Sequence, residues 1–161
     1  MTFKFACRNG RAQIVVGPDN NTVDLEKASN GKFSSEPIDA FRRWDEVRVF
    51  AQSCTDPGVA CSTDDLNAPS PWPSQVFGIG LNYRKHAEES GAKIPTTPLT
   101  FTKFPSSVGN PNADVPIVGG AVDWEVELVV VISSGGRDIR DRKSTRLNSS
   151  HVSESRMPSS A

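Results

Sequence analysis

Three acidic residues at the head of an apolar run are the first candidates for chemistry in this sequence. In the stretch GGAVDWEVELVVVI, residues 119–132, Asp123, Glu125 and Glu127 alternate with apolar residues. On a β-strand this alternation places the acids on one face, and carboxylates at positions i and i+2 lie about 6 to 7 Å apart at Cα. Two of them can therefore reach one ion. Ligation by oxygen alone favours Mg²⁺, Mn²⁺ or Ca²⁺ over Zn²⁺.

A solvated strand face is the alternative interpretation of the same residues. Acidic and apolar residues alternate in many half-exposed edge strands, and from spacing alone this interpretation is the stronger one. The apolar residues 128–132, which follow without a break, favour burial on both faces instead. Because burial of an unpaired carboxylate costs several kcal/mol, three acids on one face of a strand need water or a cation beside them.

The segment GIGLNYRKHAEESG, residues 78–91, contains the second candidate. His86 is the only histidine outside the last 21 residues, so any imidazole chemistry depends on it. On a helix His86 and Glu89 share a face, where the carboxylate can hold the imidazole tautomer and raise its basicity, as a general base requires. An exposed pair of this type is more often an ordinary surface feature. Lys103, a lone cation in the strand-like FTKFPSS, is likewise more often structural.

The first 52 residues contain the elements of a small folded unit. FKFAC and AQIVV are short β-like runs, and the Asn9-Gly10 pair between them is a strong hairpin signal because both residues tolerate positive φ. TVDLEKA, residues 22–28, is expected to be a third β-like run. EPIDAFRRWDEVRVFAQ, residues 36–52, predicts one helix, since apolar residues recur every three positions from 38 to 50 and Pro37 lies near the first turn.

The middle of the chain begins with turn signals. TDPG, STDD and APSPWP within residues 54–73 predict a linker and a boundary near residue 70. After it, QVFGIG predicts a strand, NYRKHAEES a helix that stops at Gly91, and PLTFTKF another strand. This irregular mixture predicts the α+β class rather than a regular βαβ array. GIG lacks the third glycine of a dinucleotide-binding fingerprint, which argues against a Rossmann domain.

The composition argues against several classes of partner. The chain has 161 residues, 36% of them hydrophobic and 23% charged, and a net charge of −1. That charge provides no electrostatic attraction to nucleic acid or to an anionic membrane. No run approaches the roughly 18 apolar residues of a membrane span, and the start lacks the apolar core of a signal peptide. Cys7, Cys54 and Cys61 match no zinc spacing, so we expect reduced thiols in a cytoplasmic protein.

The last 21 residues, DRKSTRLNSSHVSESRMPSSA, differ from the rest of the chain. Seven are serine, and four basic and two acidic residues give a net charge of +2 without any apolar period. A disordered tail is one interpretation. The string also resembles translated adapter or vector sequence. On this second interpretation, which we prefer, native sequence stops between Gly136 and Arg140 and the chain is an N-terminal fragment.

The order of three motifs resembles the fumarylacetoacetate hydrolase family. GLNYRKHAEE is followed by PLTFTKFPSS and then by VDWEVELVVVI, with the NYxxHAxE and DxExEL motifs at that family's spacing. The resemblance covers residues 67 to about 136 well and residues 1–66 loosely. It implies a small N-terminal α/β domain at 1–66 and, at 67–140, the N-terminal part of a catalytic domain with a mixed β-roll of the fumarylacetoacetate hydrolase type, incomplete here. Residues 141–161 are then an artefactual or disordered tail.

The resemblance also implies a function. On this resemblance the protein is expected to be a metal-dependent hydrolase that cleaves a C–C bond of a small 2-oxo or 1,3-diketo acid, such as an acylpyruvate. Glu125 and Glu127 match the family's E-x-E ligands for Mg²⁺ or Mn²⁺, and the metal stabilises the enolate that forms when the bond breaks. His86 and Glu89 match the pair on a lid helix that activates the attacking water.

Further implications and departures concern the rest of the site. Tyr83 and Lys103 are expected to bind the substrate, and the family implies a homodimer for a full-length protein. The sequence has no counterpart of a further metal-binding aspartate and a catalytic lysine, so this chain is expected to bind metal poorly, to show little activity and to expose apolar strand edges. Leu81 stands where some relatives have arginine, which argues weakly against the acylpyruvase and oxaloacetate decarboxylase branch. The alternatives are an isomerase or decarboxylase on the same scaffold, or a non-catalytic protein that binds small acids or a partner.

Overall fold

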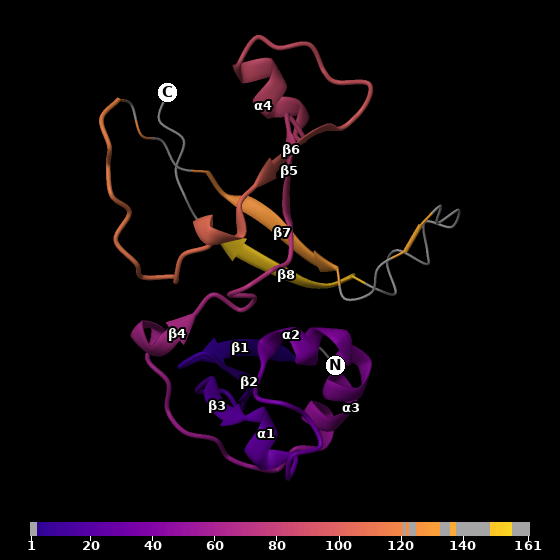
Figure 1. Cartoon of the computed structure of the whole chain (residues 1–161), viewed down its shortest axis with the longest axis vertical. Helices are drawn as coiled ribbons and strands as arrows, with labels where there is room; N and C mark the ends of the chain where they lie inside the picture. The colour runs from indigo at the N-terminus through magenta and orange to yellow at the C-terminus, as the bar shows by residue number, and fades with distance from the viewer. Residues whose placement is uncertain (1–2, 121, 123–124, 133–135, 138–148, 156–161) are drawn as a thin grey trace. The chain divides into compact units, whose positions relative to one another are not determined.

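The computed structural model describes residues 3–120, 122, 125–132, 136–137 and 149–155. The chain divides into two compact units, one from residues 1–71 and 110–161 and the other from Trp72–Gly109. Strands and short helices follow one another irregularly in the chain (Figure 1), which confirms the predicted α+β class. None of the helices in these ranges is long and apolar enough to cross a membrane.

An antiparallel sheet with the strand order β3-β2-β1-β4 organises the N-terminal part of the first unit. Its strands are β1 Lys4–Arg8, β2 Arg11–Val16, β3 Asn21–Asp24 and β4 Leu66–Asn67. The predicted hairpin between β1 and β2 is confirmed, with Asn9 at a φ of 52° and Gly10 at a φ of 74°. Positive φ at both central residues matches the right-handed twist of the paired strands, which explains the Asn-Gly pair.

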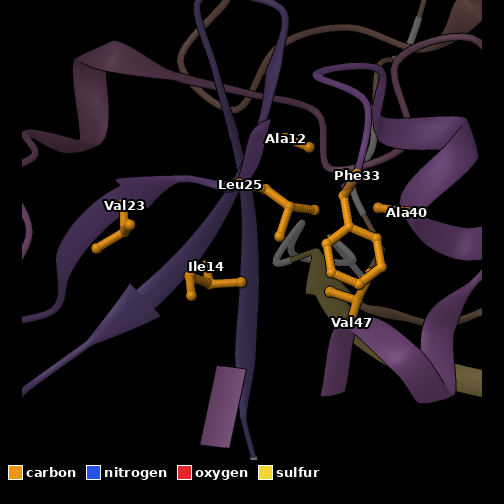
Figure 2. Packing of buried hydrophobic residues seen from close by; sticks show 7 residues of the cluster. All are labelled: Ala12, Ile14, Val23, Leu25, Phe33, Ala40 and Val47. Atoms are coloured by element: carbon orange, nitrogen blue, oxygen red, sulfur yellow. The ribbon is translucent and has the colours of Figure 1, made fainter. Parts of the chain in front are cut away.

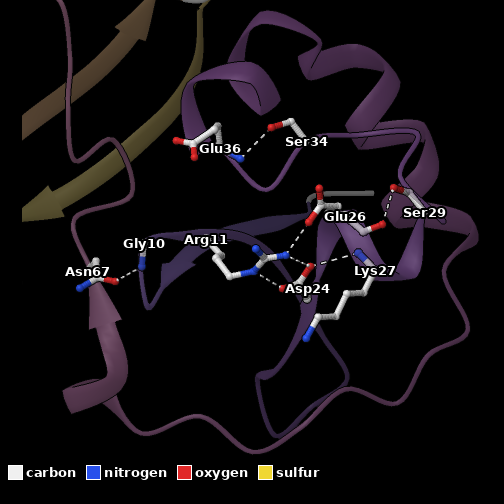
Figure 3. A network of polar contacts seen from close by, with 9 residues as sticks. All are labelled: Gly10, Arg11, Asp24, Glu26, Lys27, Ser29, Ser34, Glu36 and Asn67. Atoms are coloured by element: carbon white, nitrogen blue, oxygen red, sulfur yellow. Dashed lines mark hydrogen bonds and ion pairs between the residues drawn. The ribbon is translucent and has the colours of Figure 1, made fainter.

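The run TVDLEKA ends as a helix, so the predicted third β-like run is only half right. β3 stops at Asp24, and α1 spans Leu25–Ala28. The backbone N–H of Lys27 donates to Asp24 Oδ1 over 3.1 Å, which caps the helix. Arg11 donates to the same carboxylate, with 2.7 Å between Nε and Oδ2, and also binds Glu26 over 2.7 Å (Figure 3). The alternation of apolar residues does not reveal this polar junction.

Two helices occupy the residues for which the apolar spacing predicted one. α2 spans Pro37–Arg42, α3 spans Trp44–Ser53, and Arg43 between them has a φ of −112° and a ψ of 32°. On a straight helix of 3.6 residues per turn, a residue every three positions falls back by about 60° per step. A stripe of five such residues therefore spreads beyond one face. With the break, Phe41 is buried, whereas Ile38 remains 38% exposed.

The hydrophobic core of this part lies between the sheet and the helices (Figure 2). Ala12 and Ile14 point to the same face of β2, and Val23 of β3 is paired with Ile14. The core cluster consists of Ala12, Ile14, Val23, Leu25, Phe33, Ala40 and Val47. The ring of Phe5 extends it, with its centroid 5.2 Å from that of Phe41 and 5.7 Å from that of Trp44.

The segment predicted as a linker is tied to the N-terminal sheet. Thr22 and Val59 exchange two backbone hydrogen bonds of 2.9 Å, and β4 pairs with β1. Arg8 forms an ion pair of 2.7 Å with Asp65, the last residue of the 3₁₀-helix η1, Thr63–Asp65. The segment from Val59 to the end of β4 is therefore attached to this sheet. The predicted domain limits at residues 66 and 140 remain predictions.

The second unit contains the strands and the helix that were predicted after residue 75. Its elements are β5 Val76–Gly80, α4 Arg84–Glu89, β6 Leu99–Lys103 and the 3₁₀-helix η2 Pro105–Ser107. β5 and β6 pair antiparallel along their full length, and α4 lies in the connection between them (Figure 1). A two-stranded ribbon covers neither of its faces. Phe77, Ile79, Leu99 and Phe101 are accordingly exposed.

The acidic strand is shorter than the sequence predicted. β7 spans Glu127–Ile132 and pairs with β8, Ser149–Ser155, of which only the backbone is described. Glu125 precedes the strand, and Asp123 lies outside the described residues. The pairing of β7 with β8 begins at Glu127, the first residue of β7. In the described structure Glu125 therefore has no partner in a neighbouring strand.

The expectation that β7 is buried on both faces is wrong for the described structure. Leu128, Val129, Val130 and Ile132 are exposed, with exposed fractions from 42% to 64%, and Val131 is half-buried. The physical reason is that β7 has one described strand neighbour, and a pair of strands shields neither face.

Substitution of Gly58 tests the contact between the segment predicted as a linker and strand β3 of the sheet. Gly58 has a φ of +69°, and a methyl group on its Cα would lie 2.9 Å from the carbonyl oxygen of Thr22. Gly17 has a similar φ of +67° but open space around it. Gly17→Ala should therefore cost about 1–2 kcal/mol of unfolding free energy from backbone strain alone, and Gly58→Ala about 1–3 kcal/mol more. Urea unfolding followed by circular dichroism measures both, and equal losses would contradict the contact.

The Asp24 junction makes a pH-dependent contribution to stability. The hydrogen bond from Arg11 is the largest cause of a lowered pKa for Asp24, and the N–H of Lys27 lowers it further. A carboxyl group whose folded pKa lies below its unfolded value stabilises the fold above the unfolded pKa, about 3.9, and loses that contribution as the pH falls through the folded pKa.

Asp24→Asn should reduce the loss of unfolding free energy at acid pH, because the titrating carboxyl group is gone. The variant should retain the helix cap, because asparagine caps as well as aspartate. Asp24→Ala should lose both, and it should be about 1 kcal/mol less stable than Asp24→Asn at neutral pH. Urea midpoints between pH 2 and 7 (a range chosen around the carboxyl pKa) measure the effect. If the stability of Asp24→Asn falls at acid pH as steeply as that of wild type, the proposed contribution of Asp24 is refuted.

Candidate functional site

Four of the six predicted site residues lie in the second unit, Trp72–Gly109, and two lie in the first. Tyr83, His86 and Glu89 belong to α4 and its N-cap, and Lys103 is the last residue of β6. Glu125 and Glu127 lie just before and at the start of β7. All six side chains are exposed.

Helix α4 presents its polar residues because one small residue anchors it. Ala87 is fully buried, and its carbonyl oxygen accepts the N–H of Ala92 over 2.8 Å. The N–H and hydroxyl groups of Ser90 both donate to the carbonyl oxygen of His86, at 3.1 and 2.9 Å. Gly91, at a φ of +64°, then ends the helix as predicted. With Ala87 facing inward, the neighbouring long side chains extend into solvent.

His86 and Glu89 are separated by three positions of α4, as the sequence predicted, and such residues neighbour each other on a helix surface. Both are described, and no hydrogen bond or ion pair joins the imidazole to the carboxylate in the described structure. The pairing that a general base would use is therefore compatible with the helix but is not formed. Its catalytic role stays a prediction.

The turn that leads into α4 has a strained residue. Leu81, directly after β5, has a φ of +49°, a left-handed conformation that costs about 1 kcal/mol or more for a residue with a Cβ. It lies in the turn between Gly80 and Tyr83, and the carbonyl oxygen of Tyr83 accepts the N–H of Ala87 over 3.2 Å. Leu81, which departs from the arginine found in some relatives, is thus also a turn residue.

Lys103 is located next to an aromatic ring. It pairs with Val76 across the ribbon, and its Nζ lies 5.9 Å from the centroid of the Phe101 ring, within cation–π range. Phe101 is not among the residues predicted from the sequence to form the site. Its position two residues before Lys103, on the same face of a strand, was the signal that could have identified it.

Glu125 and Glu127 provide oxygen donors without a cationic partner in the part of the chain that the structure describes. Neither carboxylate forms an ion pair or a side-chain hydrogen bond there. No group of three or more His, Cys, Asp or Glu residues converges on a metal position among the described residues. Two exposed carboxylates two positions apart fit a hard divalent ion as a partial ligand set, and the third predicted acid, Asp123, lies outside the described residues.

Comparison with known proteins assigns the chain to a family. The family model of the fumarylacetoacetate hydrolase C-terminal domain matches residues 75–151. A homologue of fumarylacetoacetate hydrolase domain-containing protein 2 from Dictyostelium discoideum is 30% identical over 129 residues, which are 76% of this chain and 42% of that protein. The chain belongs to the fumarylacetoacetate hydrolase family. The resemblance stated from the motifs is thereby confirmed.

Two further relatives extend the comparison. A mitochondrial oxaloacetate tautomerase from Homo sapiens is 43% identical over 75 residues, 45% of this chain and 24% of that enzyme. A crystal structure from Mycobacterium smegmatis, whose protein has a provisional HpcE designation, matches 93% of this chain and 53% of its own with a TM-score of 0.81 and 39% identity. The chain spans about half the length of this structural relative and less of the curated ones.

Proposed function

We propose that the protein with this chain is a metal-dependent hydrolase that cleaves a C–C bond of a small 2-oxo or 1,3-diketo acid. The observation that carries the proposal is the family match at residues 75–151, which contains all six candidate residues. Their exposure leaves them accessible to a ligand. We also propose that residues from 67 onward contribute to a mixed β-roll, and that the full-length protein is a homodimer.

The residues would divide the chemistry as follows. Glu125 and Glu127 would hold Mg²⁺ or Mn²⁺, which when bound supplies Lewis-acid polarisation of a chelated oxo acid. His86 would take a proton from the attacking water, and the carboxylate of Glu89 would orient the imidazole. If α4 closed over a bound substrate and excluded water, the polarisation of the oxo acid by the metal ion and the contact between His86 and Glu89 would both be strengthened.

Substrate recognition would use the remaining two candidates. The ammonium group of Lys103 is exposed and forms no ion pair in the described structure, so it can accept a carboxylate of the substrate. The phenol of Tyr83, next to α4, can donate a hydrogen bond to a second oxygen.

Tautomerisation of an oxo acid is the second candidate function, and the human relative named as an oxaloacetate tautomerase favours it. In that reaction His86 would move a proton between carbon and oxygen without an attacking water. Hydrolysis in H₂¹⁸O incorporates the label into a newly formed carboxylate, whereas tautomerisation forms none. A third candidate, a non-catalytic protein that binds small acids or a partner, requires neither metal dependence nor turnover.

Loss of either β7 carboxylate should weaken metal binding. Glu125→Gln and Glu127→Gln each remove one charged ligand without a change of size, and we expect the dissociation constant for Mn²⁺ to rise by about ten-fold or more. Electron paramagnetic resonance of free Mn²⁺ measures it, and a weak wild-type affinity suffices because variants are compared. Glu88→Gln on α4 is the control and should bind as wild type. If all three variants bind equally, the metal assignment is wrong.

Loss of the imidazole should separate metal binding from turnover. His86→Ala is expected to lower kcat on acylpyruvates or oxaloacetate by about 10²–10⁴-fold, because it removes the general base, and to leave Mn²⁺ binding unchanged. Lys85→Ala, an exposed neighbour on α4, is the control and should retain full turnover. Normal turnover by His86→Ala would exclude the proposed role, and metal-independent binding without any turnover would support the non-catalytic candidate.

A further inference from the structure

The ring of Phe101 occupies space that exists only because residue 78 is glycine. Gly78 of β5 pairs directly with Phe101 of β6. A methyl group on the Cα of Gly78 would lie 2.4 Å from Cζ of the ring and 2.6 Å from Cε2, far inside van der Waals contact. The backbone of Gly78 is not in the left-handed region, so space for the ring is the requirement that this position meets.

Lys103 lies beyond the same ring on the same face of the ribbon. Strand alternation places Phe101 and Lys103 on one face of β6, and Gly78, opposite Phe101, and Val76, opposite Lys103, lie on the same face of β5. Nζ of Lys103 is 5.9 Å from the ring centroid. This face therefore has a glycine at position 78, the ring of Phe101 over that glycine, and the ammonium group of Lys103 within cation–π range of the ring.

Cross-strand packing alone would account for an aromatic ring over a strand glycine, since such pairs protect the ribbon's backbone. Two facts go beyond that role. Phe101 remains 50% exposed, so packing against the ribbon leaves half of its surface accessible. The ring also lies within cation–π range of the ammonium group of Lys103, the cation that the proposed function assigns to substrate binding.

We propose that Phe101 is a positioning residue, seated over Gly78, that holds the ammonium group of Lys103 in place for a carboxylate of the substrate. The inference rests on the proposed function, which supplies an oxo acid as the ligand, and it adds a determinant of carboxylate affinity to that site. A free lysine side chain loses rotamer freedom when it binds an anion. An ammonium group that is already restrained by a ring loses less rotamer freedom on binding. The Phe101 ring would therefore favour carboxylate binding and take no part in bond breaking.

The ribbon offers a matched pair of glycines for the test. Gly80 lies on the same face as Gly78, yet a methyl group there would lie 3.6 Å from Cβ of Leu99 and 3.8 Å from the Phe101 ring, which is ordinary contact. Gly78→Ala must displace the ring, whereas Gly80→Ala can leave it in place. Phe101→Leu removes the ring without any change in β5, and Phe101→Tyr retains it.

Three measurements on the full-length protein that contains this chain follow. In wild type the Lys103 ε-protons should show an upfield ring-current shift by NMR, and Gly78→Ala and Phe101→Leu should lose it. The same two variants should weaken binding of pyruvate, used as the carboxylate probe, by about two- to five-fold, the equivalent of an exposed cation–π contact. With oxaloacetate as substrate they should raise KM by a similar factor and leave kcat unchanged. Gly80→Ala and Phe101→Tyr should behave as wild type in all three respects.

The outcomes separate this proposal from the proposed function. If Gly78→Ala and Gly80→Ala are indistinguishable, or if the ring-current shift is lost while pyruvate affinity and KM stay the same, Phe101 is only a packing residue. Lys103→Met is the reference for loss of the ammonium group. If wild type binds pyruvate and Lys103→Met binds it equally well, this proposal fails while the enzyme assignment stands. If wild type neither binds pyruvate nor turns over an oxo acid, the proposed function fails and this proposal fails with it.

Discussion

The antiparallel register of β5 and β6 is the constraint on which the candidate site of the second unit depends. It pairs Gly78 with Phe101, and a residue with a Cβ at position 78 would displace that ring. A slip of one residue would move Lys103 to the opposite face of the ribbon, because side chains alternate along a strand. The same register brings the ends of the two strands together around the connection that contains α4. The positions of α4 and Lys103 in this unit thus follow from one pairing.

The two units derive their order from different sources. Between β1–β3 and the helices α1–α3, apolar side chains are fully buried, and Ile14, Leu25 and Val47 have no exposed surface. The ribbon β5–β6 has its backbone hydrogen bonds but exposes apolar side chains on both faces. Hydrophobic burial is the dominant favourable term in folding, so local stability differs along the chain. The residues proposed to bind and convert a substrate come from the less buried unit and from the equally exposed start of β7.

Local sequence signals predicted those elements whose cause is local. The Asn9-Gly10 hairpin and the end of α4 at Gly91 both depend on φ preferences within a few residues, and they appear where expected. The single helix at 36–52 failed because a spacing of three drifts around a helix of 3.6 residues per turn, and the chain breaks at Arg43. The strand through the acidic residues began later than predicted, because a strand requires a partner whose position the residues themselves do not encode.

The sequence by itself determined the family, the α+β class and the residue types available for chemistry. Motif spacing along the chain is a local property, and His86, Glu89, Lys103 and the two glutamates were identifiable from it. Only the tertiary structure decided that the ring of Phe101 lies over Gly78 and beside Lys103, since residues 78 and 101 meet through strand pairing across a long connection. It also decided which apolar strands are covered. Burial depends on what packs against a strand, and that is a property of the whole fold rather than of any one segment.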